Sequence, residues 1–164
     1  MAKLWDGAEF FRMMVANEKA VGDWYRRLAE DAAIGGKFFE NMAKDEDRHM
    51  KIYSALLERY EASGKFKVEV SDDHQEYLNV LLKDIVEHDN AKMLAKISKV
   101  KTKDDVFELA ESLERDSVMM VNEIMDLYPD IAPDDMKIVL NEEKKHLQMV
   151  LTRRMQSQLT NLKM

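Results

Sequence analysis

The stretch DEDRH at residues 45–49 has a close counterpart in EEKKH at residues 142–146, and the pair of stretches is the strongest indication of the fold. Both contain Glu-x-x-His, with Glu46 and His49 in the first stretch. On a helix, side chains three residues apart project from the same face, one turn apart. A carboxylate and an imidazole placed in this way can bind one metal ion, although a single Glu-x-x-His is common in acidic helices. Two copies on apolar helix faces are a much stronger indication of a metal site.

The composition favours long amphipathic helices. Of the 164 residues, 46% are hydrophobic and 35% are charged, with only five glycines and two prolines. This balance suits helices better than a strand-rich fold. We expect an all-α protein that forms a single domain over residues 1–164, because this length is usual for one domain.

Charge and cysteine content exclude several classes of function. The formal net charge is −7, and lysine and arginine are scattered along the chain, so nucleic acid is not an expected partner. The chain has no cysteine, which excludes disulfides and thiolate-bound zinc or iron–sulfur sites. Any metal must therefore be held by oxygen and nitrogen atoms.

The sequence contains no recognisable targeting or membrane segment. The first residues, MAKLWDGAEF, lack the apolar core of a signal peptide. No apolar run approaches the ~18 residues that a membrane-spanning helix needs. We expect a cytoplasmic protein without membrane contact.

A first pair of helices is predicted over residues 6–62. The first helix is expected to begin with Asp6 as its N-cap, with Glu9 completing a capping box, and to run to about Ala33. Its apolar positions alternate in steps of three and four, and Glu18 interrupts them. The second helix is expected over residues 37–61, with Glu46 and His49 in the middle of its own apolar positions.

A second pair of helices is predicted over residues 102–162, after a helical crossover at residues 66–101 that has an N-cap candidate at Ser71. The third helix is expected to begin near Thr102 and to end before Pro129. Glu114 interrupts its apolar positions as Glu18 does in the first helix. The fourth helix is expected to follow Pro133, with Glu143 and His146 facing inward.

The two pairs are related by an internal repeat. Glu18 precedes Glu46 by 28 residues, and Glu114 precedes Glu143 by 29. Each downstream glutamate is followed three residues later by a histidine. The chain therefore reads as a degenerate repeat of one helix pair, and each copy supplies Glu plus Glu-x-x-His.

Four inward-facing glutamates need compensation. Burying each as an ion would cost several kcal/mol, and mutual repulsion would disfavour four ionised carboxylates close together. Two divalent cations would balance four carboxylates, while two neutral imidazoles add ligands without adding charge. Carboxylate and imidazole together suit iron or manganese, and zinc would also bind. The predicted ligands are Glu18, Glu46, His49, Glu114, Glu143 and His146.

This ligand set is that of ferritin-like di-iron and di-manganese four-helix bundles. The sequence resembles the rubrerythrin branch of that superfamily over nearly its whole length. The stretches that carry the resemblance are VANEKAVGDWYRRLAE, FFENMAKDEDRHMKIYSALLERY, LAESLERDSVMMVNEI and IVLNEEKKHLQMVL. The resemblance implies two iron ions bridged by Glu46 and Glu143. Glu18 and His49 would complete one ion's ligands, and Glu114 and His146 the other's.

The resemblance also implies a function. A rubrerythrin-like protein is a non-haem di-iron oxidoreductase that reduces peroxide or dioxygen, and related bundles commonly form homodimers. Full-length rubrerythrins carry a cysteine-bound iron that this chain lacks, so a separate protein would donate electrons. The family tends to have a tyrosine at the place of Tyr25, which could hydrogen-bond a ligand carboxylate. It has an additional glutamate where this chain has Ser117.

Two other functions and one further ligand remain open from the sequence. The same site would serve a ferroxidase in iron storage or delivery, or a metal-binding module without catalysis. Glu111 lies one turn before Glu114 and could be an outer ligand. Asp45, Asp47 and Glu142 lie off the apolar faces, where a solvated surface explains them better.

Overall fold

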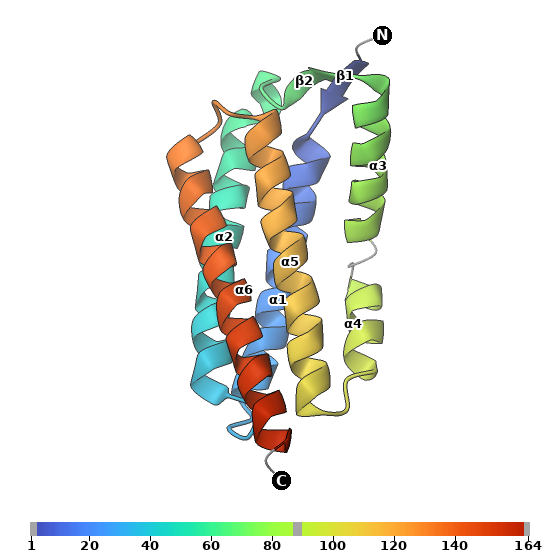
Figure 1. Cartoon of the computed structure of the whole chain (residues 1–164). Coiled ribbons are helices and arrows are strands. Elements are labelled where there is room, and N and C mark those ends of the chain that lie inside the picture. The colour runs from blue at the N-terminus through green and yellow to red at the C-terminus, as the bar shows by residue number, and fades with distance from the viewer. Residues whose placement is uncertain (1–2, 87–89, 163–164) are drawn as a thin grey trace. The chain divides into compact units, whose positions relative to one another are not determined.

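The structure, a computed structural model, describes residues 3–86 and 90–162. The chain divides into two compact units, Met1–Leu94 and Ala95–Met164. The described residues form six α-helices and only two short strands, so the prediction of a mainly helical protein is confirmed. Figure 1 shows the helices and strands with the labels used below.

In the first unit, α1 (Ala8–Ala29) packs against α2 (Gly36–Tyr60). A short turn joins them and contains Gly35. The φ angle of Gly35 is 145°, a backbone conformation that residues other than glycine rarely adopt. The 3₁₀ helix η1 (Glu61–Ser63) follows α2, and Gly64 ends it in the left-handed conformation. The first predicted helix pair therefore exists, and α2 lies within one residue of its predicted bounds, whereas α1 ends at Ala29, four residues before the predicted Ala33.

The unit also contains a small sheet that the sequence did not predict. Strand β1 (Lys3–Asp6) pairs antiparallel with β2 (Lys67–Val70), and Trp5 lies opposite Val68. Trp5 and Val70 are buried. Four-residue strands are too short to show a reliable alternation, and this pairing joins segments some sixty residues apart. The sequence therefore predicted no strand at these eight residues, and the all-α class holds for the rest of the described chain.

The predicted start of the first helix is also corrected. Its N-cap is Gly7, which has no side-chain cap, and Asp6 belongs to β1. The Asp6 carboxylate does accept a hydrogen bond from the backbone N–H of Ala8, at 3.0 Å. Because the strand takes Asp6, this carboxylate supports the strand-to-helix turn without forming the expected capping box with Glu9.

The crossover region contains two helices. α3 (Asp72–Val86) contacts α1 and β1, and α4 (Asn90–Ser98) contains the boundary between the units. The Ser71 hydroxyl accepts a hydrogen bond from the backbone N–H of His74, at 3.1 Å, which confirms the predicted cap.

In the second unit, α5 (Lys103–Leu127) packs against α6 (Pro133–Leu162). A complete capping box begins α5: the Thr102 hydroxyl accepts from the Asp105 N–H, and the Asp105 carboxylate accepts from the Thr102 N–H. Pro133 is the first residue of α6, as predicted.

The apolar faces predicted for the four long helices are buried. Among the described helices, none is both long enough and apolar enough to cross a membrane. The fully covered side chains include Phe11, Met14, Phe39 and Met42 in the first unit and Phe107, Ala110, Val121 and Val139 in the second.

Candidate metal-binding groups

The first unit brings three of the predicted ligands together. Glu18 comes from α1, and Glu46 and His49 come from α2. The His49 Nδ1 atom lies 3.2 Å from an Oε2 atom of Glu46 and 3.8 Å from Oε2 of Glu18. All three side chains are at most 1% exposed. They form a buried group, called here the α1–α2 triad.

A close approach of the two helices makes this triad possible. Gly22 lies four residues after Glu18 on α1, and a Cβ atom added to it would lie 3.4 Å from the Glu46 Cβ. A larger side chain at this position would press on the glutamate itself. Gly22 was not among the residues predicted to matter for the site, although a small residue four positions after Glu18, on the same helix face, is a recognisable signal.

Buried aromatic side chains lie about two turns after the triad glutamates on both helices. Tyr25 and Tyr53 are fully buried, and each lies seven residues after a triad glutamate. The Tyr25 ring packs against Trp24 and Phe39, with ring centroids 5.5 Å and 5.4 Å away. A hydrogen bond from Tyr25 to a ligand carboxylate stays a prediction.

The second unit contains a matching group. Glu114 comes from α5, and Glu143 and His146 come from α6. The His146 Nδ1 atom lies 3.5 Å from Oε2 of Glu114 and 3.4 Å from Oε2 of Glu143. These side chains are also at most 1% exposed, and they are called here the α5–α6 triad.

Both triads have the donor atoms and spacing that a divalent cation requires. In each triad, one ligand atom per side chain can be chosen so that all three lie within 4.8 Å of one another. When two ligand atoms each lie about 2.1 Å from one ion, the distance between them depends on the ligand–ion–ligand angle. It is about 3.0 Å at 90° and about 3.4 Å at the tetrahedral angle. The measured 3.2–3.8 Å separations from Nδ1 to the carboxylates are close to these values. The buried Glu/His groups could therefore hold metal ions.

The histidines face the carboxylates with the same ring nitrogen in both triads. Without a cation, a proton on Nδ1 of His49 can be donated to Glu46 across the 3.2 Å hydrogen bond. A cation bound at Nδ1 would require the tautomer of the neutral imidazole that carries its proton on Nε2. Metal binding at either triad would therefore depend on which ring nitrogen of its histidine carries the proton.

Glu111, the possible outer ligand, is occupied by arginines. Its Oε2 atom lies 2.6 Å from Arg154 of α6, and its Oε1 atom accepts two hydrogen bonds from Arg115. Burial alone would raise the pKa of Glu111, but the hydrogen bonds from Arg154 and Arg115 outweigh it and lower this pKa. Ion pairing with arginine accounts for this carboxylate better than metal ligation.

The carboxylates beside the first Glu-x-x-His also pair with arginines. Asp45 lies 2.6 Å from Arg48, and Asp47 accepts two hydrogen bonds of 2.9 Å from Arg26 of α1. These contacts agree with the expectation that both aspartates lie at the solvated surface.

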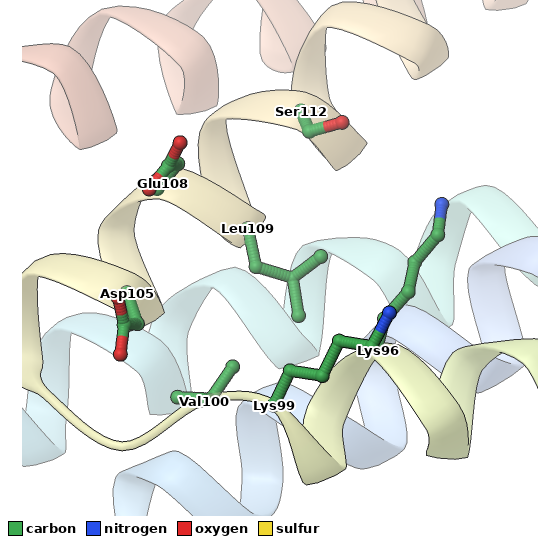
Figure 2. Close-up of a pocket in the computed structure, with 7 residues that line it drawn as sticks. All are labelled: Lys96, Lys99, Val100, Asp105, Glu108, Leu109 and Ser112. Carbon is green, nitrogen blue, oxygen red and sulfur yellow. The ribbon is translucent and has the colours of Figure 1, made fainter.

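A separate pocket of about 290 Å³ lies in the second unit at the start of α5 (Figure 2). Figure 2 shows two lysines and two acidic side chains around it. Neither triad contributes to its lining, and the Asp105 carboxylate is engaged in the capping box. The pocket therefore gives no information on the predicted metal ligands. It is lined by Lys96, Lys99, Val100, Asp105, Glu108, Leu109 and Ser112.

In comparisons with known proteins, no family model, no curated protein and no solved structure matches this chain. The resemblance to rubrerythrins therefore stays a prediction that rests on the sequence pattern.

Proposed function

We propose that this protein is a non-haem di-iron oxidoreductase that reduces peroxide or dioxygen. In this proposal, α1, α2, α5 and α6 form a ferritin-like four-helix bundle. The α1–α2 triad holds one iron ion and the α5–α6 triad holds the other. The observation that carries the proposal is that the same unusual set, two glutamates and one histidine, is buried in each half of the chain.

Charge balance supports two divalent ions. Each triad has two carboxylates, and ionised carboxylates are very unfavourable in a dry interior unless a cation compensates them. One divalent ion per triad neutralises both, and the neutral imidazole completes the set. Without the ions, protonation of the carboxylates or the histidines would have to supply the same compensation.

The donor set also supports the choice of iron. Carboxylate and imidazole ligands suit iron and manganese, and the chain has no cysteine that would favour a thiolate-bound metal. Two ferrous ions, if held by these side chains, would supply the two electrons needed to reduce peroxide to water or dioxygen to peroxide. The six side chains bind and orient the ions, and burial excludes bulk water.

Electrons must return to the centre after each reduction. The chain has no cysteine-bound iron of its own, so the proposal includes a separate electron-donor protein. We also propose that the protein forms a homodimer, as its resemblance to rubrerythrins implies.

Metal analysis after anaerobic loading with ferrous iron tests the proposal. The wild-type protein should bind about two ions per chain, and Glu46→Ala and Glu143→Ala should each lose at least one. Glu40→Ala, on the exposed face of α2, and Glu142→Ala, beside Glu143, are matched controls that should bind as the wild type does. Fewer than one ion per wild-type chain would overturn the proposal.

Stopped-flow mixing of the ferrous protein with peroxide and, separately, with oxygen tests the reaction. A much faster reaction with peroxide would support a peroxidase. A faster reaction with oxygen, together with assembly into a shell, would support a ferroxidase in iron storage. An unchanged absorption spectrum and peroxide concentration would show that the metal is structural.

A further inference from the structure

We propose that the pocket formed by the end of α4 and the start of α5 binds a small zwitterion, a molecule with a carboxylate and an ammonium group at opposite ends of an aliphatic chain. All the residues that line this pocket belong to the second unit, Ala95–Met164. Its volume is about 290 Å³, and no residue of either triad lines it. The proposed ligand site is therefore independent of the proposed metal site.

Two neighbouring segments of the chain form the pocket. Lys96 lies near the end of α4, and Lys99 and Val100 lie in the connection that follows. The first turns of α5 contribute the remaining residues, from Asp105 to Ser112. These two residues are seven positions apart, which is about 10 Å along the helix axis. The pocket is therefore long enough for a chain of several carbon atoms.

The charged groups of the pocket lie at its two ends. Figure 2 shows the ammonium groups of Lys96 and Lys99 on one side of the view and the carboxylates of Asp105 and Glu108 on the other. Among the lining residues, all of which the structure describes, no ion pair joins a lysine to a carboxylate. A molecule with a single charge would be attracted by one end and repelled by the other. A zwitterion meets a complementary charge at both ends.

Aliphatic side chains lie between the charged ends. Val100 and Leu109 occupy the middle of the view in Figure 2, and both are half-buried. Such side chains pack favourably against a hydrocarbon chain, but they offer no hydrogen bond to a polar one. Among the lining residues, Ser112 has the only uncharged polar side chain. The middle of the pocket therefore favours a ligand whose charged groups are joined by an aliphatic chain.

The two carboxylates have different roles at the acidic end. The backbone N–H groups of Lys101 and Thr102 donate hydrogen bonds to the Asp105 carboxylate and lower its pKa, so this group is ionised but already engaged in the cap. Glu108 is exposed and takes no part in the cap. Glu108 is therefore the expected partner of the ligand's ammonium group, and Asp105 adds negative charge beside it.

Titration with 6-aminohexanoate tests the inference, because this molecule has its two charges at opposite ends of an aliphatic chain. The backbone amide NMR signals of residues 96–112 should shift and reach saturation. Hexanoate and hexylamine each lack one of the charges, and norleucine is an isomer of 6-aminohexanoate with both charges on one carbon atom. Each of these probes should bind at least about threefold more weakly, the effect of losing one exposed charge contact.

Variants that remove a charge identify the two ends. Lys96→Met combined with Lys99→Met should weaken the binding of 6-aminohexanoate by about tenfold, and Glu108→Gln should weaken it by about threefold. Glu108→Gln should not weaken the binding of hexanoate, which has no ammonium group. Lys103→Met is the matched control, because Lys103 lies near the pocket but does not line it, and binding should stay within about twofold of the wild type.

Three results would overturn the proposed ligand site. The first is that 6-aminohexanoate produces no saturable shift at residues 96–112. The second is that hexanoate binds as tightly as 6-aminohexanoate, because the pocket would then select an anion and not a zwitterion. The third is that Lys103→Met weakens binding as much as the double lysine variant, which would show a general effect of charge. No iron is used in these titrations, so the proposed function would stand in each case.

Discussion

The α1–α2 and α5–α6 helix pairs present the same three side chains in different surroundings. Seven residues after each triad glutamate, the first pair has Tyr25 and Tyr53, whereas the second pair has Val121 and Val150. All four of these side chains are fully buried. A metal ligand requires a particular donor atom, while the residues around it need only fill space. The triad residues are therefore the same in both pairs, whereas the buried residues seven positions later differ in size and type.

The two pairs are also stabilised in different ways. α5 begins with a complete capping box, whereas α1 begins at a glycine without a side-chain cap and follows a strand. Ion pairs join the helices of both units, but Arg154 and Glu111 are 25% and 16% exposed, whereas Arg26 and Asp47 are 44% and 41% exposed. The following experiments test these differences.

The largest expected difference concerns the buried residues at matching positions. Tyr53→Ala should lower the free energy of unfolding by about 3–5 kcal/mol, because it removes a large buried ring. Val150→Ala removes two methyl groups and should cost roughly 2 kcal/mol. Urea denaturation monitored by circular dichroism measures both. Equal costs would show that the aromatic packing of the first unit contributes no additional stability.

Gly22 tests the close approach of α1 and α2. Gly22→Val should cost about 1–3 kcal/mol through overpacking against Glu46, and it should reduce metal binding by the α1–α2 triad. Gly22→Ala should remain within about 1 kcal/mol of the wild type, since its Cβ just fits and alanine favours a helix. Val118→Ala, at the matching position of α5, should leave metal binding unchanged. Normal metal binding in Gly22→Val would show that the close approach is unnecessary.

The inter-helix ion pairs should differ in strength. Arg154→Ala should cost about 1–2 kcal/mol, because it leaves the mostly buried Glu111 carboxylate with only the exposed Arg115 as its partner. Arg26→Ala should cost less than about 1 kcal/mol, as is usual for exposed pairs. Denaturation at low and high salt measures both, and a larger cost for Arg26→Ala would contradict the ranking by exposure.

The smallest expected effect is the pH dependence from the α5 cap. Hydrogen bonds from the backbone N–H groups of Lys101 and Thr102 lower the pKa of Asp105 below its ordinary 3.8. The Asp105 carboxylate should therefore make its full contribution to the stability of the folded state above pH 3.8, the ordinary pKa. This contribution should be lost as the pH falls through the lowered pKa of the folded state. Asp105→Asn should be less stable than the wild type at pH 7, and the two should converge in strong acid. A difference that persists unchanged into strong acid would refute this account.

The features that depend on local chemistry could be predicted from the sequence. The three-and-four spacing predicted four long helices, and the residues Thr102, Pro133 and Ser71 predicted how three helices begin. All six proposed ligands were predicted to face inward, and all six are buried. These predictions succeed because helix periodicity and capping involve residues only a few positions apart. Metal ligation by these side chains stays a prediction.

The features that depend on residues far apart in the chain could not be predicted from the sequence and are known from the three-dimensional structure. The strand at residues 3–6 exists because residues 67–70 pair with it, and this pairing removed Asp6 from its expected capping role. Glu111 pairs with Arg154 rather than remaining free, across 43 residues. Gly22 acquires its role only where α2 approaches α1. In each case the deciding partner lies on another segment, and no local pattern in the sequence identifies it.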